Sequence, residues 1–285
     1  MNADGNRIAG EELGWKLAQA HGIIESLGRV VVAFSAGVDS TFLVALAAEA
    51  VGPGNVLAVM GVSPSLAERE RQAGRGLAEG IGVRLLEVRT AELSDPAYAG
   101  NPADRCYYCK RDLFSRLGDI ARDGGYAAVL SGANADDTGD FRPGLEAGRQ
   151  MGVRSPLMEA GLTKRDIREA SRRMGLPTWD KPAMACLASR VPYGEAITAE
   201  KLSRIERAEY TLTDLGFGQC RVRDHGPLAR IEVPPGVFAG LMPLRGRIVQ
   251  RLKALGYTYV ALDLEGFRSG SMNEVLAGLL GGRPG

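Results

Sequence analysis

The short segment 35–40, with the sequence SAGVDS, combines more groups capable of chemistry than any other part of the chain. It follows the β-branched run 30–34 and precedes a helix-compatible segment. Where a strand passes into a helix, the first backbone N–H groups of the helix have no partner, and the helix dipole favours negative charge. Ser35 and Ser40 add hydroxyl donors, and Asp39 has a carboxylate that can cap the helix or bind a metal ion. The segment therefore predicts an anion-binding site.

The four cysteines are the second group with chemical potential. Cys106 and Cys109 are one turn of chain apart, and Cys186 lies in a separate run of small residues. Cys220 falls in an alternating, strand-like segment, where a buried small hydrophobic residue is expected. Structural zinc requires four ligands, and the chain has only two histidines. Three cysteines without a fourth suit a [4Fe–4S] cluster with one open iron, whereas a redox or sulfur-carrying thiol, zinc or no function remain alternatives.

The elements that must position these groups change in kind along the chain. The first part alternates short strands with helices, which predicts βαβ units and a doubly wound parallel sheet of the α/β class. The expected strands are 30–34, 56–62, 83–88 and 127–130, and the expected helices include 66–80 and 109–123. Ligands of such sheets bind at the carboxyl ends of the strands, where segment 35–40 is placed.

After about residue 194 the pattern is that of a second, smaller α+β domain. The expected elements are a helix over 197–215, paired strands over 220–223 and 228–233, a helix over 243–255 and a strand over 257–264. We therefore expect domains at 1–194 and 195–285, joined by an ordered loop over 179–194. The tail 281–285 is expected to be frayed.

Composition limits the class of protein. The chain has 285 residues with 45% apolar and 24% charged, as in soluble globular enzymes. Its 35 basic and 34 acidic side chains nearly cancel, so the overall charge predicts no attraction to nucleic acid or to a membrane surface. The first residues lack the features of a secretory signal, and no apolar run reaches the length of a membrane span. Few cysteines in a chain of this size favour reduced thiols, so we expect a cytoplasmic protein.

Segment 35–40 resembles the SGGxDS loop of the PP-loop ATP pyrophosphatases, which cleave ATP between its α- and β-phosphates to adenylate a substrate. It is not a Walker A loop, because no Gly-Lys-Ser/Thr follows. An ordinary strand-to-helix turn rich in small residues is the structural alternative. Ala36 stands where that group usually has a second glycine. If the position requires a positive φ, alanine costs about 1 kcal/mol or more there.

Several further motifs extend the resemblance. They are RCYYCK at 105–110, SGANADD at 131–137 with RPG at 142–144, ACLASR at 185–190, RVR at 221–223 with HG at 225–226, and GFRSGS at 266–271. Together they resemble the LarE family, the ATP-dependent sulfur transferases of nickel-pincer nucleotide biosynthesis, over about residues 15 to 275. The resemblance implies a PP-loop, HUP-like fold and a homo-oligomer.

The family resemblance also implies the reaction. A carboxylate of pyridinium-3,5-biscarboxylic acid mononucleotide is adenylated with release of pyrophosphate, sulfur attacks the acyl adenylate, AMP leaves and a thiocarboxylate remains. In one branch of the family a cysteine gives up its own sulfur. In another, three cysteines hold a [4Fe–4S] cluster whose open iron carries the transferable sulfide. The presence of Cys106, Cys109 and Cys186 favours the cluster, replenished by a sulfide or sulfur donor system, with a sacrificial Cys186 as the alternative.

Individual roles follow for the ATP and substrate sites. ATP with Mg²⁺ is expected on Ser35, Gly37, Asp39 and Ser40, with Gly132 and Asn134 near the nucleotide; Asp136 and Asp137 are metal ligands or solvated caps. Arg190, Arg221 and Arg223 are the expected ligands of the substrate phosphate and carboxylates. Glu209 is a candidate general base or a surface charge, and Lys110 can lower thiolate pKa values.

Three rival functions remain open at this stage. A PP-loop tRNA thiolase would require a basic surface, which the net charge of +1 disfavours. A ligase such as NAD synthetase would use ammonia and leave the cysteines incidental. A nucleotide-binding regulator would bind ATP without releasing pyrophosphate.

Overall fold

The computed structural model describes residues 3–139, 142–268 and 271–274. The chain forms two compact units: the first comprises Met1–Ser63, Glu68–Glu92 and Cys106–Met184, and the second comprises Pro64–Ala67, Leu93–Arg105 and Ala185–Gly285. The second unit thus begins before the expected boundary at 194 and includes two segments from the first half. Backbone hydrogen bonds hold those segments there, from Leu187 N to Ser65 O (2.9 Å) and from Ile197 N to Ala99 O (2.8 Å). Pairings over such sequence distances leave no local pattern.

The first unit is built on the expected parallel sheet. Its strands are β1 (Val30–Ala33), β2 (Val56–Val62), β3 (Arg84–Arg89) and β4 (Ala128–Leu130), in the order β3-β2-β1-β4. All three pairings are parallel, so their carboxyl ends share one edge. The predicted α/β class and the four strands are confirmed, with ends shifted by at most one residue.

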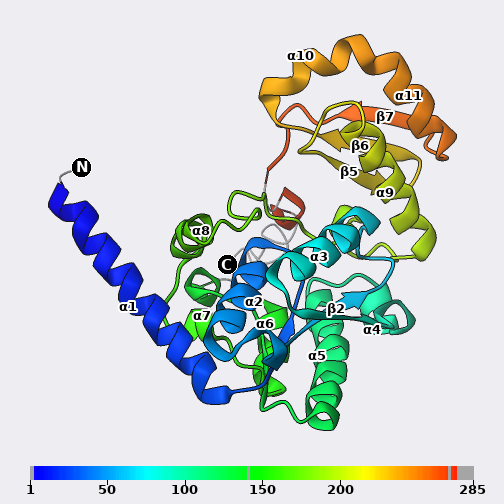
Figure 1. Cartoon of the computed structure of the whole chain (residues 1–285). Helices are drawn as coiled ribbons and strands as arrows, with labels where there is room; N and C mark the ends of the chain where they lie inside the picture. Colours follow the sequence, from blue (N-terminus) through cyan, green and yellow to red (C-terminus); the bar gives the residue numbers. More distant parts are fainter. Residues whose placement is uncertain (1–2, 140–141, 269–270, 275–285) are drawn as a thin grey trace, which may run out of the picture. The chain divides into compact units, whose positions relative to one another are not determined.

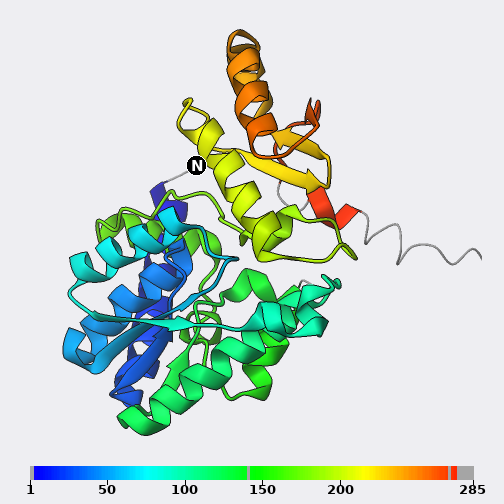
Figure 2. The ribbon, with the colours of Figure 1, turned by 90° about the vertical axis from the view of Figure 1, so that its right-hand side faces the viewer.

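Helices lie on both faces of this sheet (Figures 1 and 2). They are α1 (Ala3–Leu27), α2 (Val38–Val51), α3 (Glu68–Ile81), α5 (Arg105–Gly124), α6 (Pro143–Gln150), α7 (Pro156–Glu159) and α8 (Lys164–Arg173), with 3-10 turns η1 (Pro53–Asn55) and η3 (Ala135–Gly139). The 3-10 turn η2 (Glu92–Ser94) lies where the chain passes from the first unit into the second. On one face Phe114 and Leu117 of α5 pack on Val31 and Leu57. On the other face α3 approaches Met60 at Gly74. Alternate strand residues thus serve opposite faces.

The second unit has a three-stranded mixed sheet, as an α+β domain requires. Antiparallel β5 (Arg221–His225) and β6 (Leu228–Glu232) form a hairpin, and β7 (Tyr259–Leu262) lies parallel to β6. The helices and 3-10 turns are α4 (Pro96–Ala99), η4 (Leu187–Arg190), α9 (Ala199–Thr213), η5 (Pro235–Val237), α10 (Phe238–Leu241), η6 (Met242–Leu244), α11 (Arg245–Ala254) and η7 (Ser271–Asn273). Its core joins Leu212 of α9, Val222, Ile231 and Leu252 of α11.

Two expectations concern the limits of the chain. Across the described ranges, no helix is long and apolar enough to cross a membrane. The tail 281–285 and two residues of the GFRSGS motif, Ser269 and Gly270, lie outside the described residues.

Candidate active site

The segment 35–40 connects the carboxyl end of β1 to the first turn of α2. Gly37 is the N-cap of α2 and has no side chain to cap it, so the N–H groups of the first turn are open to a ligand. Ser40 Oγ accepts a hydrogen bond from Ser35 N (3.2 Å), lies 3.1 Å from Ser35 Oγ and donates to Gly37 O (3.3 Å). The two hydroxyls thus brace a tight loop around a helix N-terminus, which is a geometry suited to phosphate.

Ala36 adopts the left-handed conformation, with φ of 57°, and its side chain is fully buried. The position therefore does require a positive φ, as the glycine of the related loops suggested, and alanine carries a strain of about 1 kcal/mol. The loop is held from outside by Lys181, whose Nζ donates to Ala36 O (3.1 Å) and to Glu70 (2.6 Å). Sequence patterns gave no signal for Lys181.

The segment after β4 packs directly on this loop. A Cβ atom at Gly132 would lie 3.0 Å from Asp39 C and Ser40 N, so glycine is needed for the close approach. Asn134 is buried, and its Oδ1 accepts from Asp136 N (3.0 Å), while its own N donates to Asp137 (3.0 Å). Gly132 is thereby placed beside the ATP-loop candidates, whereas Asn134 shapes the following turn.

Asp39 is the candidate metal ligand of the loop. One of its carboxylate oxygens contacts Lys164 Nζ, and the other is buried without a hydrogen-bond partner among the described residues. A single orphaned carboxylate oxygen next to a phosphate site fits Mg²⁺, which takes one or two carboxylates together with phosphate oxygens. Asp136 instead accepts from Lys164 N (2.8 Å) and so supports the start of α8.

Lys164 was missed from the sequence, although a signal for its position exists. Thr163 and Asp166 form a reciprocal capping box, so the pattern T-x-x-D marks a helix start at this point. Lys164 is the first residue inside that helix, and it connects α8 to both Asp39 and Asp136. It brings a positive charge to the anion site.

Cys106 and Cys109 lie three residues apart in the first turn of α5, and so on one face of that helix. Cys106 is exposed and Cys109 is half-buried. Gly144 of the RPG motif lies beside them, since a Cβ there would be 3.0 Å from Lys110 Cγ and 3.6 Å from Cys106 O. The ammonium of Lys110 lies 5.6 Å from the centre of the Phe114 ring. The RCYYCK motif and the RPG motif of the sequence therefore lie side by side in the structure.

Cys186 belongs to the second unit, where it is the exposed N-cap residue of η4. Among the described residues, no three His, Cys, Asp or Glu side chains form a group able to hold a metal ion. The three thiols have the ligand type of an iron–sulfur cluster and are one fewer than the usual four, which would leave one iron open. Cys220 is buried, and burial raises the pKa of its thiol to about 11, so it is inert at neutral pH.

Arg190 and Glu209 form a buried bidentate pair in the second unit. Arg190 is 1% exposed, and its Nε and Nη2 donate to the two Glu209 oxygens at 2.9 and 3.0 Å. Glu209 also accepts from Val222 N on β5 (3.0 Å). Both residues were expected to act on substrate, as an anion ligand and as a general base, and the structure joins them to each other.

Arg223 forms a similar pair with Glu232 on the neighbouring strand, at 2.9 and 2.7 Å. It also donates to Ser189 O (2.8 Å) and to Ser271 Oγ (2.9 Å). Glu232 is fully buried and was missed from the sequence, because a lone glutamate at a strand end has no distinctive pattern.

Arg221 is buried on the same strand, and its guanidinium lies 5.0 Å from the centre of the Phe267 ring. Burial and the nearby charge of Arg190 lower the pKa of Arg221 to about 10, so it remains cationic at neutral pH. A site that already disfavours further positive charge favours an anion.

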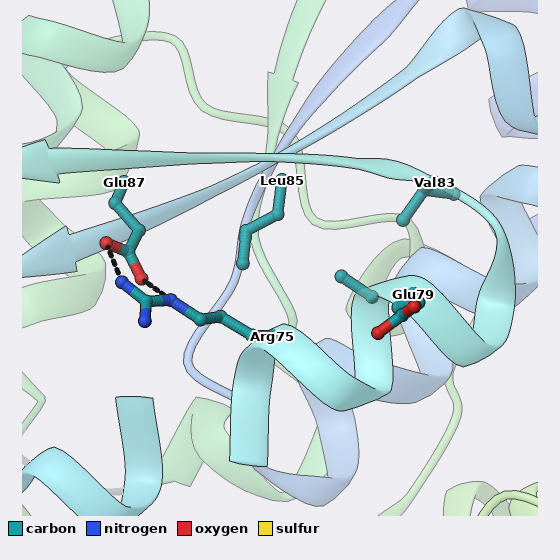
Figure 3. A pocket seen from close by; sticks show the side chains of 6 residues that line it. Arg75, Glu79, Val83, Leu85 and Glu87 are labelled. Atoms are coloured by element: carbon teal, nitrogen blue, oxygen red, sulfur yellow. Dashed lines mark hydrogen bonds and ion pairs between the residues drawn. The ribbon is translucent and has the colours of Figure 1, made fainter. Parts of the chain in front are cut away.

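One surface hollow of the first unit does not coincide with any of these residues. It lies between α3 and β3 and is lined by Arg75, Ala78, Glu79, Val83, Leu85 and Glu87. Arg75 reaches across it to Glu87 through two hydrogen bonds of 2.7 and 2.8 Å (Figure 3). The hollow contains no expected site residue.

Part of the chain matches a family model, and nearly all of it is similar to known proteins. A family model described as NAD synthase matches residues 23–100, which contain β1, the 35–40 loop, α2 and β2. An uncharacterized protein of Synechocystis sp. is 44% identical over 263 residues, covering 92% of this chain and 98% of the relative. An uncharacterized protein of Methanocaldococcus jannaschii is 27% identical over 241 residues, covering 85% and 91%.

A third relative has an assigned activity. It is the pyridinium-3,5-bisthiocarboxylic acid mononucleotide synthase of Lactiplantibacillus plantarum, 40% identical over 264 residues that cover 93% of this chain and 96% of the relative. The chain therefore belongs to the family of pyridinium-3,5-bisthiocarboxylic acid mononucleotide synthases, the LarE family.

Proposed function

We propose that the protein is an ATP-dependent sulfur transferase that converts a carboxylate of pyridinium-3,5-biscarboxylic acid mononucleotide into a thiocarboxylate. The observation that carries the proposal is the 40% identity with the Lactiplantibacillus plantarum synthase over nearly the whole chain. The anion-binding loop at α2 and the accessible thiols at α5 and η4 supply the two chemistries that such a reaction needs.

The first unit would carry out the adenylation. A carboxylate oxygen attacks the α-phosphorus of ATP, the bond between the α-phosphorus and the bridging oxygen breaks, and pyrophosphate leaves. Ser35, Gly37 and Ser40 would bind the phosphates at the α2 N-terminus, and the orphaned oxygen of Asp39 would hold Mg²⁺. Mg²⁺ would neutralise charge on the leaving pyrophosphate. The step is needed because a carboxylate has a poor leaving group, whereas AMP is a good one.

The thiols would serve the second step, in which sulfur attacks the acyl carbon and AMP leaves. We propose that Cys106, Cys109 and Cys186 hold a [4Fe–4S] cluster, which would supply the transferable sulfide. If Cys186 itself is the donor, its thiolate forms a thioester, the Cα proton is removed and the Cβ–S bond breaks. That route leaves dehydroalanine and removes one H₂S from the protein.

Binding of the substrate would fall to the arginines of the second unit. Arg221 and Arg223 alternate along β5 and so share one face of that strand. Arg221 remains charged although it is buried, and a substrate phosphate or carboxylate would offset that charge. The proposal also includes a cytoplasmic, homo-oligomeric enzyme supplied by a sulfide or sulfur donor system.

The test follows both steps in one reaction of the cluster-reconstituted protein. Wild type is expected to release pyrophosphate and form thiocarboxylate only when ATP, Mg²⁺ and the bis-carboxylate mononucleotide are all present. Cys186→Ser is expected to release pyrophosphate but form no thiocarboxylate. The absence of mononucleotide-dependent pyrophosphate release from wild type would overturn the proposed function.

The intact mass of the chain after turnover distinguishes the two sulfur sources. Thiocarboxylate with an unchanged protein mass supports delivery from the cluster. A loss equal to one H₂S, mapped to Cys186, contradicts it. Protein that stays colourless after anaerobic iron–sulfur reconstitution would also refute the cluster.

A further inference from the structure

Arg190 is the largest of the fully buried side chains, and the polar groups around it explain how a guanidinium is tolerated there. All three of its nitrogens donate hydrogen bonds inside the second unit. Removing such a charge from water requires a carboxylate partner and further acceptors, and Glu209 with nearby carbonyls provides both. An anion from solution would have to displace these partners.

The acceptors on the other side of the guanidinium belong to the segment that carries Cys186. Arg190 Nη1 donates to Ala185 O at 2.6 Å, to Cys186 O at 2.9 Å and to Ser189 Oγ at 3.0 Å. The backbone on both sides of the exposed Cys186 thiol is therefore fixed by one buried side chain.

Two more contacts connect this segment to the sheet of the second unit. Glu209, on α9, accepts a hydrogen bond from Val222 N of β5, so the pair with Arg190 is anchored to a strand. Arg223, also on β5, donates to Ser189 O at 2.8 Å. We call the set of Arg190, Glu209, Ala185 O and Cys186 O the η4 clamp.

We propose that Arg190 is a positioning residue, which acts through the carbonyl groups of Ala185 and Cys186 to hold the Cys186 thiol for sulfur transfer, and that it does not bind substrate. The thiol is solvent-exposed, whereas its backbone is held by charge-assisted hydrogen bonds from the buried Arg190. Without Arg190 the turn would keep its backbone hydrogen bond from Leu187 N to Ser65 O, but the carbonyl groups of Ala185 and Cys186 would lose the guanidinium that holds them. Displacement of a reacting group by about 1 Å costs about 100-fold in rate, which is the advantage the η4 clamp provides.

The kinetic part of this inference rests on the proposed function, so the test also has a readout that needs no substrate. Arg190→Lys keeps one charge but cannot reach Glu209 and both carbonyls together. Hydrogen exchange of the peptide covering 185–190 is expected to be at least about tenfold faster than in wild type, because Ser189 N donates to the Cys186 O that the clamp fixes.

The kinetic readout separates positioning from substrate binding. In Arg190→Lys, thiocarboxylate formation in a single turnover is expected to fall by about 10- to 100-fold, while the KM for the mononucleotide in pyrophosphate release stays within about twofold of wild type. A substrate ligand would give the reverse: a raised KM and unchanged exchange. That result would overturn the proposal.

A matched control is Arg204→Lys, which breaks another bidentate pair of the second unit, with Asp224. Arg190, and not Arg204, donates to Ala185 O and Cys186 O, so in Arg204→Lys the exchange of 185–190 is expected to stay at the wild-type rate. Equal acceleration in both variants would mean general loosening and refute the clamp.

A second variant covers the case in which Arg190→Lys does not fold. Arg190→Met combined with Glu209→Leu replaces the ion pair with apolar side chains, a change that buried pairs often tolerate. Fast exchange of 185–190 with an unchanged KM supports positioning, and a raised KM contradicts it. If wild type itself released no pyrophosphate with the mononucleotide, the proposed function would fail, and the exchange result alone would still decide for or against the clamp.

Discussion

The sharpest prediction concerns Gly132, which follows β4 and lies directly against the 35–40 loop and the first turn of α2. At Gly132 an added Cβ would lie 3.0 Å from Asp39 C and Ser40 N, and 3.2 Å from Ser40 Cα. These are backbone atoms in the first turn of a helix whose residues are largely buried, so they cannot turn aside as a flexible side chain would. Gly132→Ala must therefore displace the helix turn, the β4 segment or both.

The size of the effect follows from the overlap. Ordinary contacts of a Cβ begin at about 3.4 Å, so the two segments must separate by about 0.4 Å or more. Overpacking of this kind costs about 1–3 kcal/mol of folding free energy. Because the displaced atoms belong to the residues expected to bind phosphate, we also expect the Kd for ATP to rise by about tenfold, which corresponds to about 1.4 kcal/mol.

Urea unfolding measures the first quantity, and calorimetric titration with ATP and Mg²⁺ measures the second. The control is Gly76→Ala, in the middle of α3, where a Cβ would meet no atom within 4 Å. It should stabilise the protein by about 0.5–1 kcal/mol, since alanine is the better helix former, and leave ATP binding unchanged. Gly132→Ala with wild-type stability and wild-type Kd would refute the steric argument.

The other predictions concern single charges and thiols. In protein without a reconstituted cluster, iodoacetamide at pH 8 should label Cys186 and leave Cys220 unlabelled until the protein is unfolded, because burial raises the Cys220 pKa to about 11; early labelling of Cys220 would contradict its burial. Lys164→Met should raise the Kd for ATP by about tenfold, as measured by titration, because the variant leaves the charge of Asp39 uncompensated beside the phosphates; an unchanged Kd would exclude a role for Lys164 in binding. Glu87→Gln should lower the free energy of unfolding by about 1 kcal/mol above about pH 5, because two arginines lower the Glu87 pKa to about 2. This figure allows for the solvent that reaches the carboxylate and weakens its ion pairs. A depressed carboxyl pKa stabilises only while the group is ionised, so the difference in urea unfolding should vanish as the pH falls towards 2, and a difference independent of pH would be inconsistent with the ion pairs.

The parts of the fold that the sequence predicts are those with strong local patterns. Strands β1 and β2 are continuous β-branched or apolar runs that end at small polar residues, and β2 matches its expected range of 56–62. Helix α5 begins at Arg105, four residues before the expected start at Cys109. The sequence does not predict this first turn because it is rich in aromatic and cysteine residues, which have weak helix propensity. Helix α1 was not expected at all, although a 25-residue helix occupies Ala3–Leu27.

The same distinction holds for the candidate site, where local patterns could be recognised in the sequence and contacts between distant residues could not. The loop 35–40 could be identified because its chemistry and its position at a strand end coincide within six residues of sequence. The partners of Asp39 and Arg190 could not, since Lys164 is 125 residues from Asp39 and Glu209 is 19 residues from Arg190. Burial decides what an arginine can do, and the alternation of residues 221 and 223 along a strand does not reveal that both are buried.

The interleaved composition of the two units has a consequence for synthesis on the ribosome. Residues 64–67 and 93–105 leave the ribosome early, but their partners in the second unit begin only at residue 185. At about 5–20 residues per second, these segments wait roughly 4–24 s before even the first of those partners is made. Throughout that interval the nascent chain would display unsatisfied backbone around Ser65 and Ala99, a stage at which a chaperone or a slow translation rate has most influence on yield. A plasmid encoding only residues 195–285 would, for the same reason, omit segments that the second unit requires.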